Sequence, residues 1–236
     1  LWSSKGWITM VVAVAIAIVL VNETAIDTRL SLTRATWPGW ELGKPLWVIW
    51  AAALIFATTN AVNVTDGLDG LAGGSAMAGF AAFTGIGFLG FRNPAIYGDI
   101  VNPYDLTVFA ASFGGACAGF LWFNAAPATI FMGDVGALAL GAALALLALS
   151  LDTHLLLALI CGINVIEIGS VALQMLVFRA SGRKRRLFRL SPIHHHFELV
   201  GWAETKVIIR FWLISAACVG GALAVFIADF THQSGG

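Results

Sequence analysis

Seven long apolar runs constrain the fold of this 236-residue chain more than any other feature of its sequence. A bilayer core about 30 Å thick is crossed by a helix of about 20 apolar residues, with a range of roughly 17 to 25. Hydrophobic residues make up 59% of the chain, against roughly 45–50% in soluble proteins. The runs are residues 7–21, 46–62, 71–91, 106–123, 135–151, 155–178 and 207–230. We therefore predict an all-α, polytopic transmembrane bundle of about seven helices, which forms a single domain over residues 1–236.

Basic residues are unevenly distributed, although the formal net charge of the chain is zero. With seven spans, alternate connections lie on alternate sides of the membrane, so residue 5 and the loops near 63–70, 124–134 and 179–206 share one face. Nine of the thirteen Lys and Arg residues fall on that face: Lys5, Arg179, Arg183, Lys184, Arg185, Arg186, Arg189, Lys206 and Arg210. Because cytoplasmic loops carry an excess of Lys and Arg, we expect this face to be cytoplasmic. The zero net charge gives no indication of nucleic acid as a partner.

The first polar motif on that face is the sequence Asn-Ala-Val-Asn-Val-Thr-Asp-Gly-Leu-Asp-Gly at residues 60–70. It places two carboxylates, Asp66 and Asp69, and the amides of Asn60 and Asn63 at the end of an apolar run. Carboxylate and amide oxygens suit Mg²⁺, which proteins usually hold with one or two carboxylates plus substrate phosphates. A glycine-rich turn in which an Asp caps a helix explains the same residues equally well. The spacing does not match an EF-hand calcium loop, and the closing Glu of that motif is absent.

The second motif, Phe-Met-Gly-Asp-Val-Gly at residues 131–136, places Asp134 directly before an apolar run. A carboxylate at this position caps a helix and interacts favourably with the positive end of the helix dipole. The same carboxylate could also bind a metal ion or take part in catalysis. Both roles are compatible with the sequence.

The third motif is Pro-Ile-His-His-His-Phe-Glu-Leu at residues 192–199, within the expected cytoplasmic loop 179–206. Three consecutive imidazoles cannot all face the same way on a helix. We therefore expect one or two of them to face a shared site, where they bind phosphate or act as acid or base near neutral pH. A zinc site is disfavoured because no Cys or second His cluster has ligand spacing. The basic run at 183–189 fits either an anchor for anionic lipid headgroups or a contact for an anionic nucleotide.

Glu167 is the one acidic residue deep in a predicted span. A carboxylate within a membrane is costly, so its default interpretation is a functional or partnered group. A packing contact in which a protonated or hydrogen-bonded Glu167 meets Asn164 or another helix is an equally good explanation.

Together, these residues resemble the phospho-N-acetylmuramoyl-pentapeptide-transferase family, within the superfamily of polyprenyl-phosphate phospho-sugar transferases. The resemblance runs from Trp2 to Ile227. It is carried by residues 60–72, 131–136 and 192–199 and by the stretch Gly-Phe-Leu-Trp-Phe-Asn at 119–124. The Asp-Gly and Phe-Met-Gly-Asp motifs are similar across the superfamily, whereas the string with three His residues resembles the muramoyl-pentapeptide branch.

The resemblance implies a transferase that moves phospho-N-acetylmuramoyl-pentapeptide from its UDP carrier to undecaprenyl phosphate, with Mg²⁺ as cofactor. The products are lipid I and UMP, in peptidoglycan synthesis at the bacterial plasma (inner) membrane. Family members have about ten transmembrane helices and an active site at the cytoplasmic face, and they look dimeric. We expect the seven spans here to be the last seven. An adjacent Asp pair and a Lys that the family places before this point have no counterpart, so we expect an N-terminally truncated chain, whose activity in isolation is open.

The resemblance also assigns roles to the acidic and amide residues. Asp134 would bind Mg²⁺ or act in catalysis, and Asp66 would be a second catalytic group. Asn60 and Asp66 would contact the uridine nucleotide, and Asp69 would support them. Glu167 would line a groove beside the site.

The aromatic and imidazole roles follow in the same way. Phe131 would stack on uracil. His194, as a catalytic residue, and His195 would lie near the diphosphate, and His196 would be more structural.

Three other interpretations compete with this one. A sister enzyme using a UDP-N-acetylhexosamine shares the first two motifs but not the string with three His residues. A transporter or channel would also carry intramembrane acids, but near the bilayer midplane and in symmetric halves. Here the acids gather at one predicted surface and the sequence shows no internal repeat. An inactive fragment that only binds ligand or serves as a scaffold is the third possibility.

Overall fold

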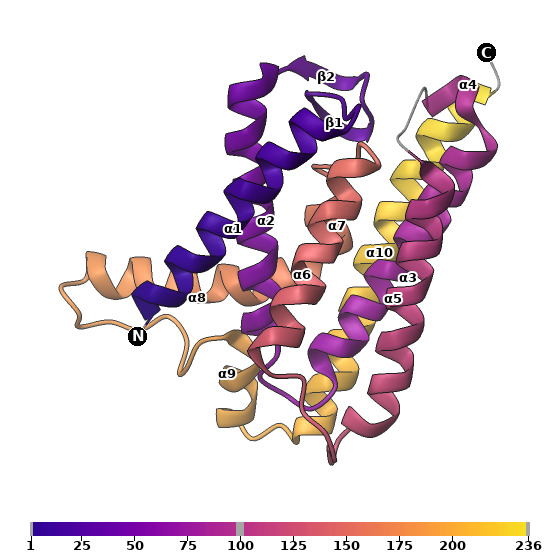
Figure 1. Ribbon diagram of the computed structural model, residues 1–236. Coiled ribbons are helices and arrows are strands. Elements are labelled where there is room, and N and C mark those ends of the chain that lie inside the picture. The colour runs from indigo at the N-terminus through magenta and orange to yellow at the C-terminus, as the bar shows by residue number, and fades with distance from the viewer. Residues whose placement is uncertain (1, 98–101, 235–236) are drawn as a thin grey trace.

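Seven long helices form the body of the computed structural model, which describes residues 2–97 and 102–234 (Figure 1). All seven are long and apolar enough to cross a membrane, which confirms the predicted number of spans and the all-α class. They are α1 (Trp2–Glu23), α2 (Gly43–Thr65), α3 (Leu71–Arg92), α5 (Pro103–Asn124), α6 (Gly133–Ser150), α8 (Gly162–Ala180) and α10 (Glu204–Ser234). Three short helices, α4 (Pro94–Tyr97), α7 (Leu157–Ile160) and α9 (Ile193–Leu199), lie between them.

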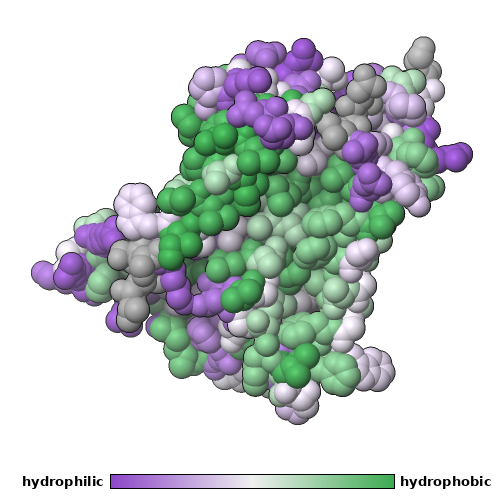
Figure 2. Space-filling model, in the orientation of Figure 1, coloured by the Kyte–Doolittle hydropathy of each residue, from purple (hydrophilic) through white to green (hydrophobic). Residues whose placement is uncertain are grey.

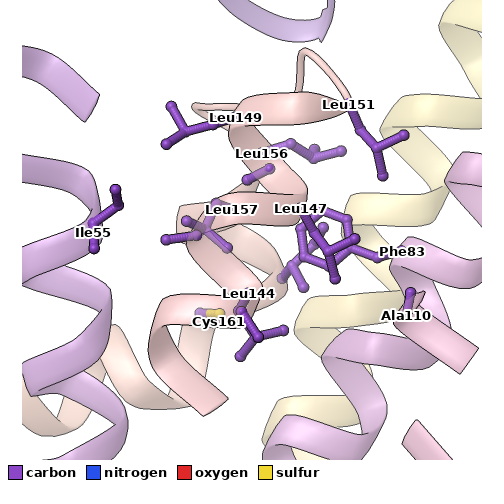
Figure 3. Packing of buried hydrophobic residues seen from close by; sticks show 14 of the residues in the cluster. Ile55, Phe83, Ala110, Leu144, Leu147, Leu149, Leu151, Leu156, Leu157 and Cys161 are labelled. Atoms are coloured by element: carbon purple, nitrogen blue, oxygen red, sulfur yellow. The ribbon is translucent and has the colours of Figure 1, made fainter. Parts of the chain in front are cut away.

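The long helices pack in two adjoining groups. Helix α2 lies between α1 and α6, while α3 packs along α5 and against α10 (Figure 1). Buried Leu, Ile and Phe side chains from α2, α3, α6 and α7 fill the space where the groups meet (Figure 3). Helices α2 and α6 approach closely at Gly141, where a Cβ atom would lie only 2.6 Å from the Cα of Thr59. Small residues allow such approaches in membranes, where lipid provides no hydrophobic drive between helices.

The apolar run at 155–178 was predicted as a single span, and this prediction is wrong. The structure divides it into α7 and α8, with the break at Cys161, whose backbone is not helical (φ −91°, ψ 29°). Gly162 begins α8, and a Cβ atom there would lie 2.5 Å from the sulfur of Cys218 on α10. The glycine therefore lets the bend pack against α10. Beyond it, α8 runs across the direction of the other long helices and extends away from the bundle (Figure 1).

The connection at 22–45 contains a small hairpin that the sequence patterns did not predict. Strands β1 (Arg29–Arg34) and β2 (Trp37–Glu41) pair antiparallel. The carbonyl of Ser31 accepts a hydrogen bond of 3.0 Å from the N–H of Leu155, so the turn between α6 and α7 lies at the same end of the bundle as the hairpin. This agrees with the predicted alternation of the connections.

Polar and apolar surfaces are separated along the bundle. Figure 2 shows hydrophobic residues over the middle of the molecule, with hydrophilic residues around the hairpin and at the far end of α8. Helices α1, α5 and α10 bury only 17%, 11% and 22% of their apolar stretches inside the bundle, as is expected of surfaces that face lipid chains. The chain is a multi-pass membrane protein.

Candidate active site

Helices α1, α2 and α6 bring three polar side chains together at the end of the bundle opposite the hairpin. The Nδ2 of Asn63 donates a hydrogen bond of 3.1 Å to one carboxylate oxygen of Asp134. The ammonium group of Lys5 contacts the other oxygen. Asp134 lies in the first turn of α6, where the positive end of the helix dipole also favours a negative charge. One carboxylate is thus held by a cation and by an amide from two other helices.

Sequence reasoning placed Lys5 on the correct face but assigned it no role. The structure places its ammonium group against Asp134. The available signal was weak, because a single lysine before an apolar run commonly anchors a helix at the membrane surface. Only the tertiary contact with Asp134 distinguishes a lysine at the candidate site from such a membrane anchor.

Asp66 follows the last residue of α2 and is partly buried. Burial raises the pKa of this carboxyl group above its usual range, and the negative charge of Asp134 raises it further. The two carboxylates are therefore close enough to repel each other. A bound cation would relieve this repulsion.

Asn60 lies on α2 and points its Nδ2 at the carbonyl of Phe56, 2.7 Å away in the preceding turn of the same helix. With Lys5, Asn63 and Asp134, it lines a cavity of about 50 Å³ between α1, α2 and α6. The predicted nucleotide-binding residue thus lies beside Asp134.

Asp69 connects two loops. One of its carboxylate oxygens accepts a hydrogen bond of 2.9 Å from the N–H of Ala128, and its own N–H donates to Glu204 at the start of α10. The N–H of the next residue, Gly70, donates to Asn124, whose side chain also donates to the carbonyl of Ile130. These contacts join the loop before α3 to the loop before α6 and to α10, while the supporting role of Asp69 stays a prediction. They also show that Asn124, which was seen only as part of a motif, fixes both loops.

Gly70 is the residue that makes this loop connection possible. Its φ of 79° lies in the left-handed region, which residues with a side chain rarely adopt. The glycine allows the chain to turn directly from Asp69 into α3.

His194 lies on α9 and reaches the interior of the bundle. Its Nδ1 is 3.0 Å from a carboxylate oxygen of Glu167 on α8, without the alignment of a hydrogen bond, and both side chains are completely buried. A Cβ atom on Gly67 would lie 2.8 Å from Cε1 of the imidazole ring and closer still to Nε2. The backbone next to Asp66 therefore packs directly against His194.

The partner of Glu167 differs from the one first considered. Asn164 instead donates a hydrogen bond of 3.0 Å to the hydroxyl of Thr65, at the end of α2. The bend at Cys161 directs α8 across the bundle, so Glu167 meets His194 rather than a neighbour on its own helix. The carboxylate deep in the span is thus a partnered group.

The other two imidazoles point elsewhere, as expected for consecutive residues of a helix. The Nδ1 of His195 is 2.6 Å from a carboxylate oxygen of Glu198 one turn along α9. The Nδ1 of His196 accepts a hydrogen bond of 3.1 Å from the N–H of Arg189. His195 is partly exposed, whereas His196 contacts the basic loop, and the roles expected of both stay predictions.

Phe131 lies in the loop before α6, three residues from Asp134. Its side chain is 76% exposed. A large aromatic ring that is exposed beside a polar cluster can stack on a planar ligand. The structure thus leaves the ring free for the predicted contact with uracil, which stays a prediction.

The basic run at 183–189 forms an ordered loop. The side chain of Gln174 on α8 accepts hydrogen bonds from the N–H groups of Leu187 and Phe188 and donates to the carbonyl of Phe188. Gln174 was not singled out from the sequence, where a Gln in an apolar run gives no specific signal. The loop presents several cations beside α9 and so adds positive charge to this end of the molecule.

The residues at this end include few metal ligands of their own. Within residues 2–97 and 102–234, no group of three or more His, Cys, Asp or Glu side chains is arranged to hold a metal ion. Asp134 and Asp66 supply two carboxylates near each other, and Asn60 and Asn63 supply amide oxygens. That donor set fits Mg²⁺ only where substrate phosphates complete the coordination, which is the usual way that proteins hold this ion.

Comparison with known proteins assigns the family. The model of glycosyl transferase family 4 matches residues 1–152, which include the Asp66 and Asp134 motifs. The chain belongs to glycosyl transferase family 4. The motif with three His residues lies beyond the matched segment.

Curated relatives cover most of the chain. It is 45% identical to a phospho-N-acetylmuramoyl-pentapeptide-transferase of Streptomyces avermitilis, over 95% of this chain and 66% of that protein. A protein of the same name from Streptomyces griseus is 43% identical over 90% of this chain and 62% of its own length. One from Mycobacterium tuberculosis is 48% identical over 82% of this chain and 55% of its own length. The chain thus spans less than two thirds of the length of these relatives.

Proposed function

We propose that this chain is part of an enzyme that transfers phospho-N-acetylmuramoyl-pentapeptide from its UDP carrier to undecaprenyl phosphate. The products would be UMP and lipid I, at the cytoplasmic face of the bacterial plasma membrane, in peptidoglycan synthesis. The observation that carries the proposal is the convergence of the three motifs at one end of the bundle. At that end, Lys5 and Asn63 contact Asp134. Gly67, the residue after Asp66, packs against His194. The curated names of relatives at 43–48% identity support the choice of substrate.

The chemistry of the proposed reaction suits the charges at this end. The reaction exchanges one phosphoanhydride for another, so its main requirement is to bring two anions together and to stabilise the negative charge of the transition state. Lys5 is an exposed cation directly beside Asp134, and the basic loop adds further positive charge. We propose that these groups attract and orient the diphosphate. The partly exposed imidazole of His195 and the exposed ring of Phe131 would contact the diphosphate and the uracil.

We propose Mg²⁺ as the cofactor, held by Asp134 with Asp66 close by. The ion would neutralise the charge of the diphosphate and make its phosphorus easier to attack. Asn63 would keep the Asp134 carboxylate oriented, and Asp69 would hold the loop that carries Asp66. Burial raises the pKa of Asp66 and the charge of Asp134 raises it further, which supports the proposal because a cation bound beside both carboxylates would relieve their repulsion.

The lipid substrate requires an apolar approach to the site. Helix α8 exposes the apolar side chains of Val165, Ile166, Leu173 and Leu176 on either side of Glu167 along the chain. We propose that the polyprenyl tail stays in the bilayer along α8 while its phosphate reaches the polar loops. The predicted homodimer depends on the resemblance alone and stays a prediction.

A transfer assay tests the proposal. Labelled phospho-muramoyl-pentapeptide on its UDP carrier is incubated with undecaprenyl phosphate and Mg²⁺ in detergent, with this chain and with an N-terminally extended one. We expect lipid I from the extended chain and none after Asp134→Asn. Transfer from UDP-N-acetylglucosamine instead would assign the chain to the sister branch. No transfer from either donor would contradict the proposal.

A transporter is the alternative from a different class, and the geometry argues against it. Transporter sites lie near the bilayer midplane at the interface of repeated halves. Asp66, Asp69 and Asp134 all lie where a helix ends or begins, at one end of the bundle.

A further inference from the structure

A second polar cavity lies at the opposite end of the bundle, where the hairpin, α4 and the turn after α6 meet. Its volume is about 620 Å³, within the range of roughly 300–1,000 Å³ that is typical of small-molecule sites. Residues 25–41, 95–97 and 150–152 contribute to its walls. None of these segments contains a residue of the candidate active site.

The walls of this cavity are firmly held. Arg34 on β1 forms an ion pair of 3.0 Å with Asp229 near the end of α10, and Thr33 donates a hydrogen bond of 2.7 Å to the same carboxylate. The ring of Tyr97 on α4 stacks on Phe226 of α10, with ring centroids 5.4 Å apart. The hairpin and α4 are therefore both fixed to α10, and the cavity between them is a permanent part of the fold.

Two buried polar atoms of the cavity residues lack partners. Asp152 is 7% exposed and Tyr97 is 6% exposed, and both residues line the cavity. Within the described parts of the chain, 2–97 and 102–234, neither Oδ1 of Asp152 nor the hydroxyl of Tyr97 has a hydrogen-bond partner. An unsatisfied buried polar group costs about 1–3 kcal/mol, and more when it is charged. A ligand that hydrogen-bonds to these atoms would recover that cost.

The charges around the cavity favour a cation as this ligand. Arg34 is neutralised by Asp229, and Arg29 lies 3.4 Å from Glu41 and 3.9 Å from Asp27, so one guanidinium is shared by two carboxylates. Asp152 has no basic partner among the described residues. Burial raises the pKa of the Asp152 carboxyl to about 7, with a smaller contribution from Asp27.

The donor set distinguishes between kinds of cation. No group of three or more His, Cys, Asp or Glu among the described residues is arranged to hold a metal ion by itself. An ammonium group needs only two or three acceptors around its N–H bonds. The Asp152 carboxylate and the Tyr97 hydroxyl are the buried acceptors in these walls that have an atom without a partner among the described residues.

We propose that this cavity binds a primary ammonium group, with Asp152 as its counter-charge and the Tyr97 hydroxyl as a second acceptor. Two sources can present this chemistry at a membrane surface: the headgroup of an ethanolamine phospholipid and a water-soluble amine. The cavity is large enough for either. The proposal does not depend on the transferase activity, because the cavity lies at the other end of the bundle.

Ligand-induced thermal stabilisation of this chain in detergent tests the proposal. The probes are 1,3-diaminopropane with 1,3-propanediol as its uncharged control, and phosphatidylethanolamine with phosphatidylglycerol as its control in mixed micelles. At saturation we expect a rise in Tm of about 5 °C at pH 8 with one ammonium probe and none with its control. Stabilisation by the lipid alone identifies the headgroup as the source, and stabilisation by the free amine identifies a soluble ligand.

Variants show whether the effect arises in this cavity. Asp152→Asn should abolish the ligand-induced rise, and Tyr97→Phe, which keeps the ring that stacks on Phe226, should weaken binding about tenfold. Asp105→Asn is the matched control, because Asp105 is exposed in the first turn of α5, outside the cavity. Each rise is measured against the same variant without ligand. An equal rise in wild type and Asp152→Asn, or no rise with any ammonium probe, would overturn the proposal.

Discussion

The contact between Gly67 and His194 gives a sharp test of how the active-site loops are held. A Cβ atom on Gly67 would lie 2.8 Å from Cε1 of the imidazole, whereas carbon atoms in ordinary contact are about 3.5–4.0 Å apart. The substitution Gly67→Ala therefore requires the ring or the loop to move by roughly 1 Å. His194 has no room to move into solvent, because its side chain is completely buried against Glu167.

We expect a displacement of this size to lower the transfer rate about 100-fold, which corresponds to about 2.7 kcal/mol in the activation barrier. The rate would be measured as lipid I formed per minute by the N-terminally extended chain. Gly85→Ala is the control, because nothing lies within 4 Å of a Cβ atom at that position in the middle of α3. Its rate should match the wild type, and its helix should be slightly more stable.

A double-mutant cycle separates an effect through His194 from a general loss of structure. If Gly67→Ala acts by displacing the imidazole, it should cost little more in a background that already carries His194→Ala. Additive losses would show that the two residues act independently. A Gly67→Ala enzyme within threefold of the wild-type rate would refute the packing argument.

Three further predictions follow from the charged groups. Lys5→Met should lower the transfer rate at least tenfold, yet leave thermal stability in detergent nearly unchanged, because the ion pair with Asp134 is exposed and screened by water. Chelation with EDTA should abolish transfer by the extended chain, and excess Mg²⁺ should restore it; full activity in EDTA would rule out the proposed ion. Burial raises the pKa of Asp152 to about 7 from 3.8, so its contribution to stability should fall by up to about 4 kcal/mol as the pH rises from 4 to 7. Burial lowers the pKa of His154 to about 4, so the contribution of His154 to stability rises with pH. Comparing the SDS unfolding of wild type and Asp152→Asn at pH 5 and pH 8 therefore isolates the aspartate. A difference in stability between the two proteins that is the same at both pH values would contradict the assigned pKa.

Length and hydropathy were sufficient to predict the seven spans, because each long helix in a membrane must cover its backbone with apolar side chains. The same signal could not locate the break at Cys161. The residues on both sides are apolar, and the bend depends on the fit between Gly162 and Cys218, two residues far apart in sequence. The hairpin at 29–41 was also missed, since its alternation is short and includes a Pro and a Gly.

The candidate site was predictable as a set of motifs but not as a set of contacts. The alternation of the connections across the membrane was enough to predict that the three motifs lie at one end of the bundle. It could not show that Glu167 meets His194, because that contact depends on the direction of α8 after the bend. It also could not show that Lys5 reaches Asp134, because the register of α1 against α2 and α6 is set by side-chain packing.

The Lys5–Asp134 ion pair and the Glu167–His194 contact, both at the candidate-site end, differ in their exposure. In the Lys5–Asp134 pair, the side chains are 68% and 51% exposed, so water screens the attraction and little free energy is needed to separate them. An incoming diphosphate or cation can therefore replace one partner with little loss. The Glu167–His194 contact is completely buried, so neither side chain has access to solvent. In the proposed reaction, the imidazole would stay fixed against Gly67 while the exposed pair rearranges, so one part of the site would position the loop and the other would exchange its contacts during binding.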